Sequence, residues 1–255
     1  MTDQFAAAAR ALAATDRGVV SLTGAGVSLA SGIPTFRSDD GLWNRYDPVE
    51  YGHIEAFKRD PEKVWRMLFD LDEILEQARP NAAHRAIAEL EQLGVVTHVL
   101  TQNADGLHQR AGSTHVVELH GSNRTLVCLT CDHRRTREEV RGTLTARTAP
   151  RCTTCEEVLK PDAVFFGEPL PRQALRDAHD AVERCSTLLV VGTSAEVYPV
   201  ADLPQLARVA GATIVEVNPE PVLPADHRLA GPAEELLPQL VARIRDTEPH
   251  HEEPR

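Results

Sequence analysis

The apolar and polar positions of this chain alternate between two patterns. Apolar runs of strand length occupy residues 19–23 (VVSLT), 95–103 (VVTHVLTQN), 116–121 (VVELHG), 187–194 (TLLVVGTS) and 213–218 (TIVEVN). Apolar residues at helical spacing occupy residues 3–15, 61–78, 84–94, 171–185, 202–211 and 233–246. Strands that are apolar throughout and alternate with helices predict an α/β fold, a parallel sheet with helices on both faces.

Residues 124–159 depart from this alternation. They hold four cysteines and many threonines and arginines, and they show little apolar periodicity. We expect that such a segment cannot build a core from apolar side chains and that it needs a metal. The charged residues at the end of the chain, 247–255, are predicted to be a disordered tail.

The four cysteines form two Cys-x2-Cys pairs, Cys128 with Cys131 and Cys152 with Cys155, separated by 20 residues. Four thiolates are the tetrahedral ligand set that Zn²⁺ prefers, although iron in a rubredoxin-like site is an alternative. With four protein ligands, no position is left for water or substrate, so the predicted role is structural. Cys185 stands apart, and we interpret it as a small buried hydrophobic residue.

Composition and charge narrow the class of protein. The 255 residues are 42% hydrophobic and carry a formal net charge of -11, so the chain suits a large core with a small satellite and does not suit direct nucleic-acid or anionic-membrane binding. A basic partner such as a lysine-rich peptide is compatible with this charge. The N-terminal residues lack the pattern of a signal peptide, and no apolar run reaches the ~20 residues that span a bilayer. Paired cysteines fit a reducing compartment, and we expect a cytoplasmic protein.

Small and polar residues follow three of the predicted strands. Gly24-Ala25-Gly26 follows the first strand and leads into a predicted helix, an arrangement that suits a diphosphate. The turn is not a full G-x-G-x-x-G, and no acidic residue ends a second strand about 20 residues on. Gly192-Thr193-Ser194 and Asn218 follow two further strands. Any one of these could be a plain turn, but the three together predict a ligand site at the carboxyl ends of the strands.

Polar residues also follow the strand at 95–103, namely Gln102, Asn103 and Asp105, and His120 ends the run at 116–121. A histidine is the natural general base near neutral pH. We interpret His84, His98 and His108 as structural. Residues 31–43 (SGIPTFRSDDGLW) lack periodicity, and we favour a mobile loop that folds over a ligand rather than a plain surface connection.

In chain order the motifs read GAGVSLASGIPTFRSDDGLW, TQNADGLHQRAG, ELHG, the two Cys-x2-Cys pairs, FFGEPLP, GTSAEVYP and VNPE. Together they resemble those of the sirtuins, the NAD-dependent protein lysine deacylases of the silent-information-regulator family. The resemblance covers roughly residues 16–240. It implies a Rossmann-like NAD-binding domain formed by residues 1–39, 80–123 and 160–246. It also implies a small zinc-binding and helical domain formed by residues 40–79 and 124–159.

The resemblance assigns roles to residues of this chain. His120 is implied to be the catalytic base, with Asn103 and Asp105. The implied NAD-binding residues are Gly24, Ala25, Gly26, Ser28, Pro34, Phe36, Arg37, Trp43, Gln102, Asn103, Asp105, His120, Gly192, Thr193, Ser194, Asn218, Pro219 and Glu220. Val164, Phe166, Gly167, Glu168 and Val197 are implied to contact the acyl-lysine peptide, which adds as a strand.

The implied reaction transfers the acyl group from lysine to ADP-ribose. The acyl oxygen attacks the ribose carbon as nicotinamide leaves, Phe36 shields the reactive face, and His120 accepts a proton from a ribose hydroxyl. NAD is consumed as a co-substrate, and the zinc is structural. Mono-ADP-ribosyl transfer and an NAD-bound regulatory module with little turnover are the alternatives.

Some positions depart from the family pattern. Ala104 replaces the usual Ile or Val, Ala30 replaces a common Glu, and Pro219 removes a backbone N–H beside Asn218. The succinyl- and malonyl-removing subgroup carries Tyr-x-x-Arg where this chain has Leu68 and Leu71. An apolar pair cannot neutralise an acyl carboxylate, so we expect a preference for neutral acyl groups.

Overall fold

The computed structural model describes residues 2–35 and 45–247. Its centre is a six-stranded sheet whose neighbouring strands are all parallel. The strands are β1 (Val19–Thr23), β2 (Val96–Thr101), β3 (Val116–Glu118), β7 (Thr187–Val191), β8 (Thr213–Asn218) and β9 (His227–Ala230). Their order is β3-β2-β1-β7-β8-β9. The strands β2 and β3 are thus added on one side of β1 and the strands β7 to β9 on the other, and this switch point is typical of dinucleotide-binding folds.

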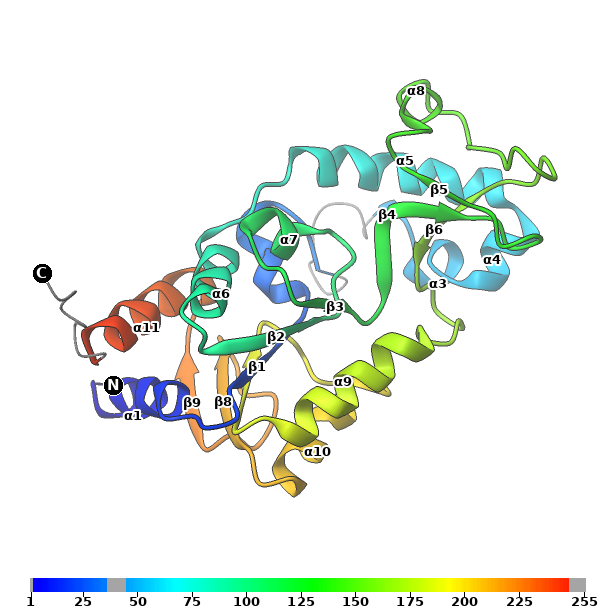
Figure 1. Ribbon diagram of the computed structural model, residues 1–255. Coiled ribbons are helices and arrows are strands. Elements are labelled where there is room, and N and C mark those ends of the chain that lie inside the picture. The colour runs from blue at the N-terminus through cyan, green and yellow to red at the C-terminus, as the bar shows by residue number, and fades with distance from the viewer. Residues whose placement is uncertain (1, 36–44, 248–255) are drawn as a thin grey trace, which may run out of the picture.

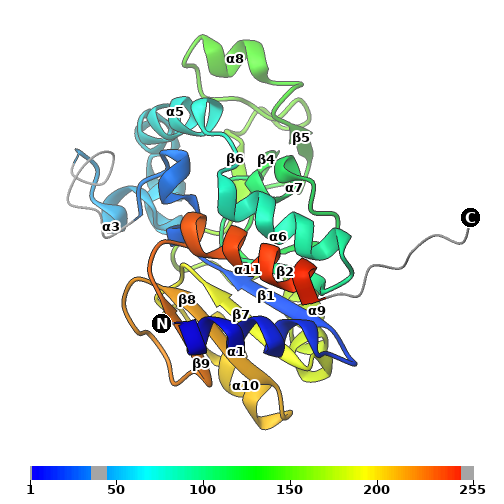
Figure 2. The ribbon, with the colours of Figure 1, turned by 90° about the vertical axis from the view of Figure 1, so that its left-hand side faces the viewer.

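Helices cover both faces of this sheet, which confirms the predicted α/β class (Figures 1 and 2). On one face α1 (Thr2–Ala13), α6 (Ala82–Gln92) and α11 (Ala233–Thr247) bury residues such as Leu12 and Ile87. On the other face α9 (Arg172–Arg184) and α10 (Leu203–Val209) bury residues such as Val182. Alternate strand positions supply the two cores, because successive side chains of a strand point to opposite faces.

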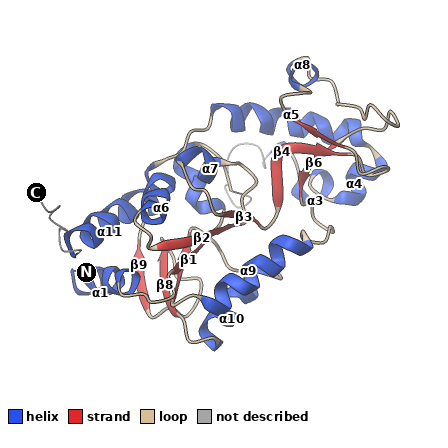
Figure 3. Ribbon diagram, viewed as in Figure 1, coloured by secondary structure: helices blue, strands red, loops and turns tan. Residues whose placement is uncertain are grey.

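A third core lies in the part of the molecule formed by a second group of helices and strands, beyond the carboxyl ends of the parallel strands. Figure 3 shows this group beside the six-stranded sheet. Its helices are α3 (Pro48–Tyr51), α4 (Ile54–Arg59), α5 (Pro61–Gln77) and α8 (Arg141–Thr145). Its antiparallel sheet has the order β5-β4-β6, with β4 (Gly121–Val127), β5 (Arg134–Thr136) and β6 (Lys160–Ala163). The buried Trp65 of α5 donates its indole N–H to the Leu159 carbonyl over 2.8 Å, which joins the two chain segments.

The expectation that residues 124–159 lack an apolar core was therefore wrong. Leu126, Val140, Ala149, Val158 and Leu159 pack with residues of α4 and α5 in one cluster. These apolar positions are too widely spaced to show a periodicity. They form a core only because α5, which lies far away in the sequence, supplies the other side of it.

Other departures from the sequence predictions are local. The strand β9 was not predicted, because only Leu229 of its four residues is a buried apolar residue. The helix expected after the glycine turn is a 3-10 helix, η1 (Ala25–Ser31), which ends at Gly32 with φ 84°. His120 does not end a strand but lies in the turn between β3 and β4. Short elements complete the fold: α7 (Leu107–Ala111) and η2 (Val200–Asp202).

Within the described ranges, every helix is too short or too polar to cross a bilayer.

Candidate functional site

The predicted ligand-binding turns meet at the carboxyl ends of β1 and β7. The Gly26 N–H donates to the Gly192 carbonyl over 2.8 Å, and the Gly24 N–H donates to the Val191 carbonyl over 3.1 Å. A Cβ atom on Gly26 would lie 2.7 Å from the Gly192 oxygen. Gly192 has φ 57°, and a Cβ atom there would lie 2.4 Å from the Val27 nitrogen. These glycines are therefore required first for the contact between the two turns.

Three predicted side chains form one hydrogen-bonded cluster beside this contact. Ser28, which is 1% exposed, donates its hydroxyl proton to Asp105 Oδ2 over 2.7 Å. The Asn103 amide nitrogen donates to the Ser28 hydroxyl and to the Gly24 carbonyl, each over 3.1 Å. The Asp105 Oδ1 atom accepts the Leu107 N–H over 2.8 Å. The cluster thus fixes the amide and the carboxylate relative to the glycine turn.

Burial and hydrogen bonds oppose each other at Asp105. Desolvation raises the pKa of its carboxyl group, while the Leu107 N–H and the Ser28 hydroxyl lower it, and the net direction is upward. A carboxylate in such a place accepts hydrogen bonds from hydroxyl groups, as a ribose would offer them.

Two histidines that we interpreted as structural lie beneath this cluster. His84 Nδ1 accepts the Asn81 N–H, so its Nε2–H faces the Ser28 hydroxyl at 3.4 Å. His108 Nε2 lies 3.0 Å from the Thr23 hydroxyl, which donates to Thr101. Burial lowers the pKa of His84 to about 4 and that of His108 to about 3, so both support the site as neutral groups. The Asn-x-x-His spacing marks His84 in the sequence only as the N3 residue of a capping box, and it does not indicate the contact with Ser28.

The geometry of His120 suits a general base. Its Nδ1 lies 3.0 Å from the Gln102 carbonyl oxygen, which can only accept, so Nδ1 carries the proton and Nε2 keeps its lone pair. Desolvation lowers the pKa of His120 more than the Gln102 bond raises it. The ring is therefore neutral at pH 7. The backbone carbonyl oxygen of His120 accepts the Val164 N–H over 2.8 Å. Val164, which is predicted to contact the substrate, is therefore bonded to the backbone of the proposed base.

The residues predicted for the adenosine half follow β7 and β8. Thr193 Oγ1 accepts from the Gln102 amide over 2.8 Å, and the Asn218 amide nitrogen lies 3.3 Å from the Thr193 carbonyl oxygen. Pro219 and Glu220 are exposed next to Asn218. Ala25, Pro34 and Ser194 lie half-buried in the same turns and loops. Phe36, Arg37 and Trp43 lie outside the described residues.

The predicted peptide-contacting residues differ in solvent exposure. Phe166 and Val197 are 47% and 45% exposed, and Gly167 is also exposed. The backbone of Phe166 bridges to the helical segment, because its N–H donates to Gly52 and its carbonyl accepts from Ile54. The Glu168 carboxylate turns inward, where it accepts the Phe165 N–H over 2.7 Å and pairs with Lys160 at 3.0 Å. Its side chain thus holds the loop and does not face outward.

The four cysteines of the two pairs converge, with all four Sγ atoms within 4.8 Å of one another. The distances are 3.4 Å for Cys128–Cys155 and 3.6 Å for Cys131–Cys152. Ligand bonds of about 2.3 Å to a tetrahedral Zn²⁺ place sulfurs about 3.8 Å apart, so the donor set fits this ion. Cys185 is 1% exposed and bonds to the Val182 carbonyl, as a buried residue outside the site.

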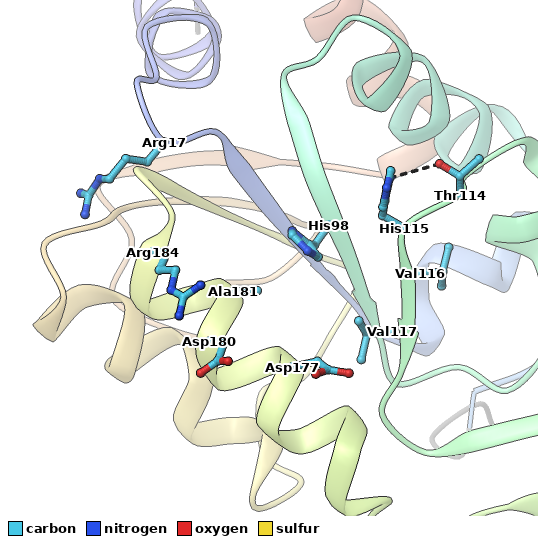
Figure 4. A pocket seen from close by; sticks show the side chains of 10 residues that line it. All are labelled: Arg17, His98, Thr114, His115, Val116, Val117, Asp177, Asp180, Ala181 and Arg184. Carbon is cyan, nitrogen blue, oxygen red and sulfur yellow. Dashed lines mark hydrogen bonds between the residues drawn. The ribbon is translucent and has the colours of Figure 1, made fainter.

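Two cavities in the structure do not coincide with the predicted site. A cavity of about 450 Å³ lies between β2, β3 and α9, and is lined by His98, His115, Asp177 and Arg184 among others (Figure 4). A second cavity of about 640 Å³ shares Val116, Val117 and Asp177 with it and extends along β4. Neither is lined by a residue of the predicted site, which is recognised by its hydrogen bonds.

Comparisons with known proteins agree with the geometry. The model of the Sir2 family matches residues 24–199. An NAD-dependent protein deacylase of Archaeoglobus fulgidus is 47% identical over 230 residues, which cover 89% of this chain and 93% of the relative. A solved Sir2 homologue in complex with NAD has a TM-score of 0.84 and 42% identity, covering 93% of both chains. Sir2Af2 bound to a myristoylated histone peptide has a TM-score of 0.81 and 38% identity, covering 96% of this chain and 98% of that one.

Metal analysis of cysteine variants tests the four-cysteine site. We expect about one zinc ion for each chain of the wild-type protein, because four thiolates complete a closed tetrahedral site. Cys152→Ser should lose most of this metal and should expose residues 124–159 to protease. Cys185→Ser, at the buried cysteine that lies apart, is the control and should keep the metal. Equal zinc content in the two variants would contradict the assignment, and iron in place of zinc would correct the metal.

The pH dependence of stability tests the buried histidines. Their folded-state pKa values of about 4 for His84 and about 3 for His108 lie below the usual 6.5. Below pH 6.5 the unfolded chain therefore binds more protons than the folded one, and stability is lost as the pH falls towards 4. Each histidine contributes a slope of about 1.4 kcal/mol per pH unit. In urea unfolding at pH 7 to 4.5, His108→Gln should show a shallower loss than the wild type. The exposed His179→Gln is the control; identical slopes for all three proteins would refute this account.

Proposed function

The chain belongs to the Sir2 family, and from this premise we propose that it is an NAD-dependent protein lysine deacylase. The single observation that carries the proposal is the state of His120, a neutral imidazole whose Nε2 lone pair is set by the Gln102 carbonyl. Asn103, Asp105 and Ser28 are bonded together beside the glycine turns. A general base next to glycine turns and polar side chains at the switch point of the sheet suits chemistry on a dinucleotide ribose.

The proposed domains follow the three clusters of buried residues. Residues 1–39, 80–123 and 160–246 form the NAD-binding domain, supported by the two clusters that cover the six-stranded sheet. Residues 40–79 and 124–159 form the proposed small domain, supported by the third cluster. The strand β6 and Phe165 also belong to the small sheet and its core, so they lie across the proposed boundary at residue 160. The tail, 247–255, lies outside both.

In the proposed mechanism the turns at Gly24–Gly26 and Gly192–Ser194 hold the phosphates and adenosine, while Asn103 and Asp105 orient the nicotinamide ribose. NAD supplies the ribose carbon that takes the acyl oxygen as nicotinamide leaves. His120 Nε2 accepts a proton from a ribose hydroxyl, which makes that oxygen a nucleophile towards the acyl carbon. A bound zinc would take no part in this chemistry, because the four cysteines would fill its ligand positions.

The proposed protein substrate presents an acylated lysine in an extended segment. Val164, Phe166, Gly167 and Val197 supply the surface, and the exposure of Phe166 and Val197 supports this role. A cytoplasmic location is part of the proposal, supported by cysteines that form a metal site rather than disulfides.

Product analysis tests the function. The wild-type protein is incubated with NAD and an acetylated lysine peptide, and the products are weighed by mass spectrometry. We expect free peptide, nicotinamide and acetyl-ADP-ribose in equal amounts. His120→Ala should lose at least about 100-fold in kcat/KM, because the base is removed. A peptide that gains ADP-ribose would instead identify an ADP-ribosyltransferase, and unchanged substrates would identify a regulatory module.

The acyl preference rests on α5. Leu68 is 4% exposed and belongs to the small core, and Leu71 packs against the same cluster. Neither leucine can pair with a carboxylate, and burying an unpaired charge costs several kcal/mol. We therefore propose that the site accepts neutral acyl groups and discriminates against succinyl and malonyl groups.

Matched peptides test this preference. We expect kcat/KM for an acetyl peptide to exceed that for a succinyl peptide by at least about 100-fold, which corresponds to ~3 kcal/mol. Leu71→Arg combined with Leu68→Tyr should narrow the ratio, because the guanidinium can pair with the acyl carboxylate. Gln77→Arg, which adds the same charge at an exposed position of α5, is the control. Comparable kcat/KM values of the wild type for the acetyl and succinyl peptides would contradict the prediction.

A further inference from the structure

A fully buried carboxylate lies behind the proposed adenosine site. Glu216, in the interior of β8, is 0% exposed. Its Oε1 atom accepts the Asn218 amide N–H over 3.1 Å and the Val222 backbone N–H over 2.9 Å. Its Oε2 atom makes no hydrogen bond within the described part of the chain. Burial of a carboxylate is costly, and a hydrophobic strand would be stable with an apolar residue at this position.

The hydrogen bonds of Glu216 settle the orientation of the Asn218 amide. The Asn218 Nδ2 atom lies within reach of two oxygens, Glu216 Oε1 at 3.1 Å and the Thr193 carbonyl at 3.3 Å. Both oxygens can only accept, so the NH₂ group of Asn218 has to face them. The amide oxygen Oδ1 then faces away from both. Without the Glu216 carboxylate, one of the two contacts that distinguish the amide nitrogen from the amide oxygen is lost.

An Asn218 amide locked in this way offers a ligand an acceptor and no donor. A hydroxyl of the adenosine ribose has a proton to donate to Oδ1, whereas a phosphate ester at the 2′ position has none and is negatively charged. We propose that Glu216 is the positioning residue that fixes Asn218 as an acceptor and thereby selects a dinucleotide with free ribose hydroxyls over one with a 2′-phosphate. This inference rests on the proposed function, because it takes Asn218 to hold the adenosine half.

Two opposite charges lie behind Asn218. Glu216 pairs with Arg228, whose Nε atom lies 3.7 Å from Oε2 and whose NH2 atom donates to the Pro219 carbonyl over 3.0 Å. The Pro219 bond directs this guanidinium towards the backbone that follows Asn218. The buried carboxylate would repel a 2′-phosphate that approached Asn218, and the Arg228 guanidinium would offset part of this repulsion, so the orientation of the Asn218 amide carries the selectivity.

The position of the acid on the sheet is unusual. In most dinucleotide-binding folds an acidic residue at the end of the second strand contacts the ribose directly. Here that strand, β2, ends in Thr101, and Gln102 follows. Glu216 lies instead on the other half of the sheet, two residues before the end of β8. It has no exposed surface, so it can act on a ligand only through the residues that it contacts, of which Asn218 is the one assigned to the adenosine half.

Binding measurements test the proposal without relying on turnover. The affinities of ADP-ribose and of 2′-phospho-ADP-ribose are measured by calorimetry for the wild type and variants. We expect Glu216→Met to weaken ADP-ribose binding about tenfold and to lower the selectivity for ADP-ribose at least tenfold. Glu216→Gln keeps an acceptor oxygen for Asn218 and Val222 and should bind within threefold of the wild type. Asp226→Asn is the control, because this acid holds the Ile214 N–H at the other end of β8 and should change neither affinity.

Several outcomes would overturn the proposal. One is an unchanged selectivity in a folded Glu216→Met variant, and another is a loss in Asp226→Asn equal to that in Glu216→Met. If Glu216→Met does not fold, the variant Glu216→Met with Arg228→Met removes both charges and is compared with Arg228→Met alone; equal selectivity of these two overturns the proposal. Failure of the proposed function is distinguishable. A wild type that shows the Glu216-dependent selectivity but does not deacylate a peptide defeats the function and leaves this inference intact.

Discussion

The contact between two glycine turns is the constraint on which the rest of the site depends. The Gly26 N–H and the Gly192 carbonyl meet over 2.8 Å where the sheet changes its direction of growth. A side chain on either residue would push β1 and β7 apart at their carboxyl ends. The two halves of the sheet carry different polar residues, with Asn103 and Asp105 on one side and Asn218 on the other. The close approach of the turns lets hydrogen bonds join the two sides, because Gln102 bonds to Thr193 and Asn218 bonds to the Thr193 carbonyl.

From that contact, hydrogen bonds continue across the carboxyl edge of the sheet without interruption. Glu216 bonds to Asn218, Asn218 to the Thr193 carbonyl, Thr193 to the Gln102 amide, and the Gln102 carbonyl to His120. Each bond adds only about 1 kcal/mol to stability, but each unpaired group in this buried setting would cost 1–3 kcal/mol. These hydrogen bonds therefore persist mainly because an unpaired polar group would cost more free energy than each bond contributes. It places the amide of the adenosine half and the imidazole of the base in one fixed relation.

The sequence predicted most of this frame, because continuous apolar runs and glycine turns report local requirements directly. The strand at 213–218 and its Asn218 were predicted with the bounds that the structure has. The inward turn of Glu168 could not be predicted, because it depends on Lys160 meeting it in space. The same holds for His84, whose role depends on a contact with Ser28 across 56 residues of chain. Periodicity records which face a residue occupies and not which distant polar group it meets there.

His120 is the point at which the two parts of the molecule meet. Its imidazole is held by the residue after β2, which belongs to the large sheet, and its carbonyl is held by Val164, which follows β6 of the small one. β6 pairs with β4, whose end leads into the first cysteine pair. The cysteines thus act at a distance from the chemistry. By fixing one end of β4 and the approach to β6, a bound zinc would hold the wall proposed for the acyl-lysine peptide, while the large sheet carries the proposed base and dinucleotide site.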